Sequence, residues 1–247
     1  MIKKKIFNII IDNLKTLFFA LIIAILIRSL IIQPFYIPSS SMEPNLLVGD
    51  RIFVSKYDYG YSKHSFPFSP NFSNKRFFFS EPDQGDLVVF KTPADNRTDY
   101  IKRLIGLPGD EIQFLKGEIF INGSKIKRRI MNLEKKIYCG NFILDTNTYV
   151  ETLPNGVEYL AVYKKEGTLK NTRKFVVPAN HYFLMGDNRD CSKDSRYLSS
   201  VGYVHKDNLV GKAQFIFFSS DRSIGSIFSF WKWNKSIRFD RFFQKIK

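Results

Sequence analysis

The stretch that decides the fold class is EIFINGSKIKRR, residues 118–129. Its Asn122-Gly123 dipeptide separates two strand-like runs, and Asn-Gly in that setting is a strong signal for a two-residue hairpin turn. Other runs rich in apolar and β-branched residues, bounded by Gly, Pro and Asp, are typical of strands; they cover 50–57, 86–91, 100–106, 182–186 and 208–219. These runs do not alternate with helical patterns, which argues against a parallel α/β sheet. We therefore predict a mostly β fold.

The middle of the chain differs from its flanks. Residues 111–180 are polar and rich in hairpin signals, whereas the segments on either side are more apolar. We interpret 111–180 as a second β domain, inserted into a β core that is built from 34–110 and 181–222.

A long apolar run precedes the β region. LFFALIIAILI, residues 17–27, is uninterrupted, and after Arg28 and Ser29 the run continues to Ile32. A bilayer needs about 20 apolar residues, and an arginine near one end can snorkel to the surface. We predict a transmembrane anchor at 16–33 behind a basic N-terminus at 1–15. The lysines that make this N-terminus basic keep it cytoplasmic by the positive-inside rule, and the rest is exported; they are Lys3, Lys4, Lys5 and Lys15.

Two other interpretations of the apolar run are weaker. A cleavable signal peptide needs small residues just beyond the apolar core, and IIQPFYIP, residues 31–38, offers none at the required spacing. A helix that packs on the core of a soluble domain normally has a polar face, which 17–27 lacks. One uncleaved span is the expectation.

The composition points to an anionic partner. The chain has 247 residues, of which 44% are hydrophobic and 16% aromatic, and its net charge is +15. The basic residues are scattered among apolar ones without a nucleic-acid-binding motif, so anionic membrane lipid explains the charge better than DNA or RNA does. The two cysteines and three histidines show no metal-ligand spacing. We expect no metal and no cofactor.

Two aromatic stretches suggest contact with the membrane surface. Residues 64–82 mix Phe with Pro and Ser, and the tail at 223–247 interleaves Trp and Phe with Lys and Arg. Rings beside cations suit the headgroup layer. An ordinary mixture of core and surface residues, or base stacking on RNA, are the alternatives. Insertion of either stretch into lipid is left open.

Three segments contain residues that could take part in catalysis. IPSSSMEPNLL, residues 37–47, presents three serines just beyond the anchor, but a serine needs a base to become a nucleophile. Lys102 lies in a strand-like run with Tyr100 and Leu104 on the same side, and such apolar surroundings lower a lysine pKa toward neutrality. MGDNRDCSKDSR, residues 185–196, has the composition of a turn network.

Together with GDLVVFK at 85–91, these segments resemble type I signal peptidases, the membrane-anchored serine proteases that remove signal peptides. The serine segment, 85–91, the lysine segment at 99–110 and 185–196 follow in the family's order behind one anchor. The likeness extends over nearly all of 17–219. It implies a β fold with a catalytic core and a second, inserted β domain, which agrees with the pattern described above.

The resemblance also implies residue roles. Ser41, which is followed by Met-x-Pro as in the family, falls on the nucleophile, and Lys102 falls on the general base of a Ser–Lys dyad. Ser39 falls on the residue whose hydroxyl completes an oxyanion hole with the Ser41 backbone N–H, and Ser192 on one that orients the lysine. The positions that fall on structural residues near the site are Gly186, Asp187, Asp194 and Arg196.

By the same resemblance, the substrates are preproteins with small residues at −1 and −3, cleaved on the outer side of a bacterial cytoplasmic membrane, with the export machinery nearby. Shallow apolar pockets would read those small residues; their expected lining is Ile37, Pro38, Met42, Leu46 and Ile101. Nine residues separate Ser41 from Ile32, so an extended chain holds the serine within about 30 Å of the bilayer.

The sequence departs from the family at two positions. Ser40 stands where many members have Gly, and Cys191 stands where others have Asn. Cys191 could pair with Cys139 in an oxidising compartment, but we expect two free thiols. The rival functions are a self-cleaving repressor, a protease that processes conjugation proteins, and a non-enzymatic membrane module. The first needs a DNA-binding module in place of the anchor, and the last would be expected to have lost Ser41 or Lys102.

Overall fold

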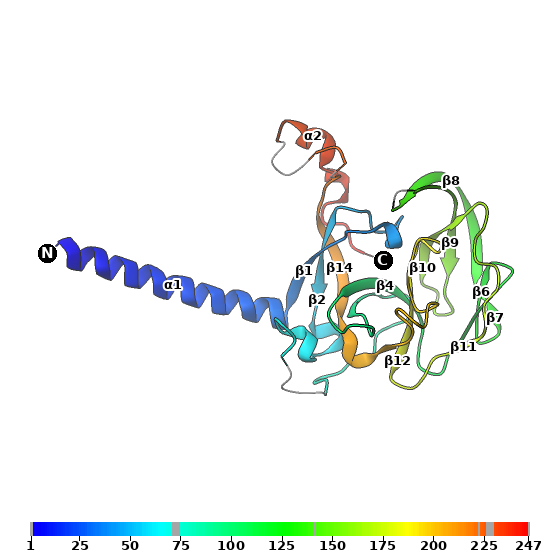
Figure 1. The fold of residues 1–247 in the computed structure, drawn as a ribbon, viewed down its shortest axis with the longest axis horizontal. Coiled ribbons are helices and arrows are strands. Elements are labelled where there is room, and N and C mark those ends of the chain that lie inside the picture. Colours follow the sequence, from blue (N-terminus) through cyan, green and yellow to red (C-terminus); the bar gives the residue numbers. More distant parts are fainter. Residues whose placement is uncertain (1, 71–74, 141, 222, 226–229, 247) are drawn as a thin grey trace.

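The computed structural model describes residues 2–70, 75–140, 142–221, 223–225 and 230–246. Figure 1 shows a body made mostly of strands, from which one long helix projects. The predicted mostly β fold is confirmed. The predicted runs correspond to β2, Asp50–Ser55; β3, Leu87–Lys91; β4, Asp99–Gly106; β12, His181–Met185; and β14, Leu209–Ser219.

The helix α1, Ile2–Leu30, contains the apolar run. Within the described residues, its Lys4–Leu30 portion is the one helix long and apolar enough to cross a membrane, and its apolar window is not buried against the body. A helix that is apolar on every side has no polar face to turn toward water. These features fit a membrane anchor.

The largest sheet has seven strands in the order β1-β2-β14-β3-β4-β12-β13, and its paired strands are antiparallel. Its remaining strands are β1, Ile32–Tyr36, and β13, Val204–His205. Strand β1 follows α1 almost directly, so the helix leads straight into an edge of this sheet.

Two smaller sheets come from the middle of the chain. One has the order β10-β9-β8 and the other β11-β5-β6-β7. Their strands are β5, Glu111–Leu115; β6, Glu118–Ile121; β7, Ser124–Lys125; β8, Lys127–Cys139; β9, Phe142–Thr152; β10, Glu158–Lys164; and β11, Phe175–Val176. The predicted hairpin is confirmed: Ile121 pairs with Ser124, and Asn122 and Gly123 both have the positive φ that a type I′ turn requires.

The hydrophobic core is shared between the sheets. One buried cluster contains Ile112 and Ala161 from the small sheets together with Ile105, Phe183 and Met185 from the large sheet. A second cluster packs the serine segment, through Met42 and Leu46, onto the large sheet. The middle segment is therefore fixed to the large sheet by apolar contacts.

The C-terminal segment folds back onto the large sheet. It contains α2, Trp233–Ser236, and bridges pair Ile237 with Ser220 and Lys245 with Phe215. Arg241 forms an ion pair of 2.6 Å with the fully buried carboxylate of Asp50. Several aromatic side chains of this segment remain exposed: Phe230, Trp231, Trp233, Phe239 and Phe243. The sequence pattern did not reveal this packing, and part of the tail, 226–229, lies outside the described residues, as do 71–74 of the other aromatic stretch.

The remaining short segments are 3-10 helices: η1, Ser40–Met42; η2, Tyr57–Tyr59; η3, Lys63–Ser65; η4, Lys206–Asn208; η5, Phe230–Lys232; and η6, Phe239–Arg241.

Candidate active site

Ser41 lies in η1, a single turn between β1 and β2. Met42 and Leu46 are fully buried in the core and hold this turn from below. From the other side, the backbone N–H of Asn188 donates to the carbonyl of Ser41 at 3.1 Å, and its side chain donates to the carbonyl of Ser40 at 3.2 Å. The serine turn is thereby fixed against the 185–196 segment.

Lys102 lies on β4 and reaches Ser41 across 61 residues of sequence. Its Nζ is 2.7 Å from Ser41 Oγ and 3.0 Å from the carbonyl of Ile101. The side chain is 4% exposed, and the amine lies 5.4 Å from the centre of the Tyr100 ring. A buried amine beside a serine hydroxyl can accept its proton when it is neutral.

Burial lowers the pKa of Lys102 to about 8, against the attraction of the Asp194 and Asp187 carboxylates. Loss of water around the ammonium disfavours its charged form, and this effect outweighs the carboxylates. The guanidinium of Arg196 contributes to the same lowering. A substantial fraction of neutral amine is therefore present near neutral pH.

The other serines occupy different positions. Ser39 is exposed, and its Oγ lies 3.3 Å from Ser41 Oγ. Ser40 Oγ lies 3.6 Å from Cys191 Sγ. Ser192 is buried, and its Oγ makes no hydrogen bond to the Lys102 amine in the described chain, so the expected bond is not formed here. The carbonyl of Ile101 orients the amine instead, and a role for Ser192 stays a prediction.

Asp194 and Arg196 form a buried ion pair behind the site. Arg196 donates to both carboxylate oxygens of Asp194 at 2.8 Å, and the Gly186 N–H donates to the same carboxylate at 3.0 Å. Burial raises the pKa of Asp194, but the charge of Arg196 and these hydrogen bonds hold it below its usual value. The carboxylate therefore stays ionised and the pair remains neutral overall.

Gly186 allows two chain segments to approach each other closely. A Cβ at this position would lie 2.2 Å from Ser192 Oγ and 2.5 Å from the carbonyl oxygen of Ser41. Any larger residue would push the serine turn away from the 185–196 segment.

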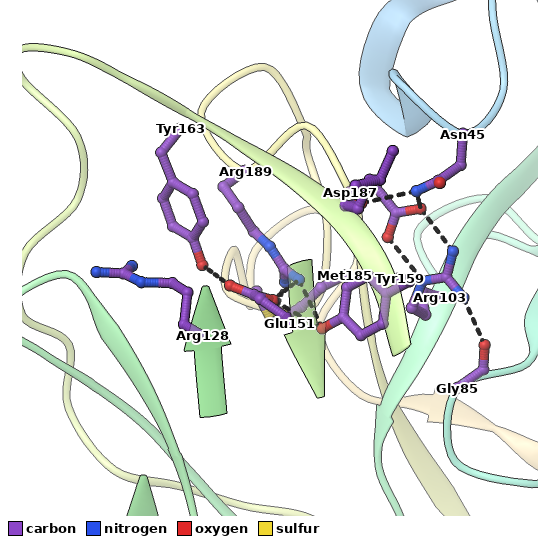
Figure 2. A network of polar contacts seen from close by, with 12 residues as sticks. Asn45, Gly85, Arg103, Arg128, Glu151, Tyr159, Tyr163, Met185, Asp187 and Arg189 are labelled. Carbon is purple, nitrogen blue, oxygen red and sulfur yellow. Dashed lines mark hydrogen bonds and ion pairs between the residues drawn. The ribbon is translucent and has the colours of Figure 1, made fainter. Parts of the chain in front are cut away.

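Asp187 is the centre of a second buried network. Arg103 donates to its two carboxylate oxygens at 2.8 Å each, and Asn45 donates to it at 2.7 Å (Figure 2). Arg103 also donates to the carbonyl of Gly85. Arg103 follows Lys102 in the chain, and Asn45 closely follows Ser41. This network therefore fixes the positions of both Ser41 and Lys102. Sequence reasoning missed Arg103, Asn45 and Asn188; their positions inside the quoted segments were the available signal.

A cavity of about 390 Å³ opens beside Ser41 and Lys102. Its walls come from β1, the serine segment and β4; the lining residues are Phe35, Tyr36, Ile37, Pro38, Ser39, Ser41, Ile52, Val89, Thr98, Asp99, Tyr100, Ile101, Lys102, Cys191 and Lys193. Met42 and Leu46 were expected here and are absent from the lining. Both are fully buried in the core beneath the turn, so this expectation is corrected.

Cys139 and Cys191 form a disulfide, with Cα atoms 5.6 Å apart. The expectation of two free thiols is therefore wrong. The reason is the long β8–β9 hairpin, whose end carries Cys139 across to the wall of the cavity where Cys191 lies. The disulfide ties the middle segment to the wall of this cavity.

We expect loss of this disulfide to destabilise the protein. It closes a separation of 52 residues, and a loop of that size is worth about 2–4 kcal/mol in the free energy of unfolding. Thermal melts of wild type and of the Cys139→Ser/Cys191→Ser variant, with and without dithiothreitol, measure this. Reductant should lower the melting temperature of wild type to that of the variant and leave the variant unchanged. Equal melting of oxidised and reduced wild type would contradict the prediction.

Comparison with known proteins places the site in a family. The model of the signal peptidase, peptidase S26 family matches residues 10–218. The chain belongs to this family. It is 43% identical to signal peptidase I of Rickettsia typhi over 92% of this chain and 90% of the relative. It is 41% identical to signal peptidase I of Rickettsia bellii over 94% of this chain and 84% of the relative.

A crystal structure of a signal peptidase I from Enterococcus faecalis V583 aligns with 54% of this chain and 97% of its own, at 26% identity and a TM-score of 0.33. Family membership makes the chain a serine peptidase that removes signal peptides, and α1 fits a membrane-anchored enzyme. The non-enzymatic alternative is thereby set aside.

Proposed function

We propose that this signal peptidase cleaves exported preproteins through a dyad in which Ser41 is the nucleophile and Lys102 the general base. The observation that carries the proposal is the 2.7 Å contact between a buried lysine amine and a serine hydroxyl on the wall of a cavity. Ser40 is a poorer candidate, because its hydroxyl lies against Cys191 Sγ.

The reaction follows from this contact. Neutral Lys102 takes the proton of Ser41 as Oγ attacks the scissile carbonyl carbon, which forms a tetrahedral intermediate. The ammonium then gives this proton to the leaving amine nitrogen, the C–N bond breaks and an acyl-enzyme remains. Lys102 next deprotonates a water that attacks the ester, and the proton returns to Ser41 Oγ when the acid leaves.

The negative charge of each tetrahedral intermediate needs donors. Ser39 Oγ, 3.3 Å from Ser41 Oγ, and the Ser41 backbone N–H are the donors we assign to it. Removing one such donor costs about 2.7–4 kcal/mol of transition-state stabilisation in other hydrolases. Ser192 would bond the lysine amine once substrate has entered, while Asp194 and Arg196 support the wall behind it.

Substrate specificity is assigned to the apolar part of the cavity. Ile37, Pro38 and Ile101 lie on its walls. A shallow apolar pocket accepts a methyl group and excludes larger side chains, which supports small residues at −1 and −3.

We assign the cytoplasmic segment to 1–15, the anchor to 16–33, the catalytic core to 34–110 and 181–222, the inserted domain to 111–180 and the interfacial tail to 223–247. The N-terminal lysines support a cytoplasmic N-terminus, a single span and catalysis on the outer face of a bacterial cytoplasmic membrane. Anionic lipids and nearby export machinery are the remaining proposed partners.

The test is cleavage of a preprotein by the full-length enzyme in detergent, with the new N-terminus identified by mass spectrometry. A substrate with Ala at −3 and −1 should be cut after the second Ala. The same substrate with Phe at −1 should be cut about 10–200-fold more slowly, whereas Phe at −2 should have little effect. Failure to cut the Ala-x-Ala substrate, or equal rates with Phe at −1, would overturn the proposal.

The activity should rise with pH. Because the neutral amine of Lys102 is the reactive form and its pKa is about 8, kcat/KM should increase about tenfold per pH unit below that value and level off above it. A pH profile of wild type beside a His181→Gln/His205→Gln variant measures this, and both should show the same rise. A rise centred near about 6.5, the ordinary pKa of histidine, and absent from the variant would contradict Lys102 as the base.

A further inference from the structure

A second cavity, of about 120 Å³, lies at the C-terminal end of α1. Its lining comes from five parts of the chain: Arg28, Gln33, Phe35, His64, Ser65, Phe66, Pro67, Phe68, Ser69, Lys91, Asp99 and Val210. The segment that follows β2, cyan in Figure 1, lies beside the helix end, where Tyr61 Oη donates to the carbonyl of Leu30 at 2.8 Å. The cavity therefore sits at the level where an anchored helix leaves the bilayer.

Positive charge dominates this cavity. Arg28 forms no ion pair within the described part of the chain, and Lys91 pairs at 2.9 Å with Asp99, the one carboxylate of the lining. Lys56, which is not part of the lining, is fully buried, and its Nζ has no hydrogen-bond partner among the described residues. A buried amine without a partner is costly to protonate, so an anion nearby would stabilise its charged form.

The charges of the lining act directly on Lys56. Burial is the largest of the effects that together lower its pKa to about 7; the charges of Arg28, Lys91 and Arg76 act in the same direction, against the attraction of Asp99. An anion in the cavity would offset this mutual repulsion. His64 adds a neutral hydrogen-bonding group, because burial lowers its pKa to about 4.

Apolar surface borders the same cavity. Phe68, in the lining, is fully exposed, and its backbone has a positive φ of 62°. The exposed apolar surface of α1 begins at Ile27, next to Arg28. A free inorganic anion would gain nothing from this surface, whereas the acyl chains of a lipid would cover it.

We propose that this cavity binds the phosphate-bearing headgroup of an anionic phospholipid, with Arg28, Lys91 and Lys56 supplying the positive charge. This site specifies the lipid partner of the proposed function. It would hold the catalytic sheet at a fixed height beside the anchor, since β1 joins the two.

Lipid retention by the detergent-purified full-length chain, measured by native mass spectrometry, tests the site without any catalytic step. The probes are phosphatidylglycerol, phosphatidylcholine and inorganic phosphate. Wild type should retain phosphatidylglycerol in preference to phosphatidylcholine, and an excess of inorganic phosphate should not displace it. Each Lys or Arg near anionic lipid contributes about fivefold in affinity, so Arg28→Gln/Lys91→Gln should bind about 25-fold more weakly.

The matched control is Lys170→Gln/Arg173→Gln, which removes the same charges from exposed positions in the middle segment and should bind as wild type does. If the double variant at the cavity does not fold, Arg28→Gln alone should lose about fivefold. Equal retention by the cavity variant and wild type would overturn the proposal, as would displacement of the lipid by inorganic phosphate. Failure of preprotein cleavage would leave this measurement intact.

Discussion

Ser41→Ala and Lys102→Met should each lose preprotein cleavage by about 10⁴–10⁶-fold, while Ser40→Ala keeps most of its activity. Ser41 Oγ is the attacking atom in the proposed reaction, and the Lys102 amine at 2.7 Å is the group placed to take its proton. Methionine retains much of the length and apolar character of the lysine side chain, so the loss reports the amine. Initial rates on an Ala-x-Ala preprotein measure the effect.

Two further variants test whether Lys102 acts as a general base or only as a positive charge. Lys102→Arg keeps a cation that does not deprotonate at these pH values, so it should be as inactive as Lys102→Met. The Ser41→Ala/Lys102→Met double variant should be no slower than either single variant, because residues that act as one unit are not additive. Activity in Lys102→Arg would contradict the role of base. An inactive Ser40→Ala with an active Ser41→Ala would move the nucleophile by one residue.

Much of the fold could be predicted because local sequence patterns determine its turns and strands. Asn122-Gly123 specifies its own turn geometry, and strands such as β4 are bounded by residues that end them. The pairing of Ser41 with Lys102 is a long-range contact, and it was predicted through the resemblance of complete segments to a family. Spacing alone would not have distinguished Lys102 from a surface lysine.

The misses share a physical cause, which is that they depend on distances between segments. The end of the β8–β9 hairpin brings Cys139 to Cys191, a separation that the sequence does not give. Met42, in η1, and Leu46, beyond it, both pack into the core on the large sheet and not into the cavity. Arg241 reads as a membrane-facing cation in the tail, yet it neutralises the buried Asp50.

Glu151 is the clearest example of a residue whose distant contacts the sequence does not reveal. Its substitution has the largest expected effect on stability. Glu151 reads as a polar strand residue, but it is fully buried on β9 and pairs with Arg189 at 2.6 Å. Figure 2 shows Tyr159 and Tyr163 directed at the same carboxylate, and Tyr159 Oη donates to it at 2.8 Å. Arg189 follows Asn188, which holds the serine turn, so this pair connects the middle sheets to the candidate active site.

Glu151→Gln should lower the free energy of unfolding by about 3–5 kcal/mol, because it leaves the Arg189 guanidinium buried without its counter-ion. For a chain of this size, that corresponds to a fall of roughly 6–20 °C in melting temperature. Glu151→Leu/Arg189→Met removes both charges and should recover much of the loss, since no unpaired charge then remains. Thermal melts in detergent measure all three proteins.

The control is Glu111→Gln, which breaks the exposed pair with Lys174 and should change the free energy of unfolding by about 1 kcal/mol or less. The Glu151→Gln enzyme should lose cleavage activity over the temperature range in which it unfolds. The reason is that Arg189 is adjacent in the chain to Asn188, whose N–H holds the serine turn. A melting temperature within a few degrees of wild type for Glu151→Gln would mean that water or a rearranged tyrosine satisfies Arg189. In that case the buried pair would not be what joins the middle sheets to the serine turn.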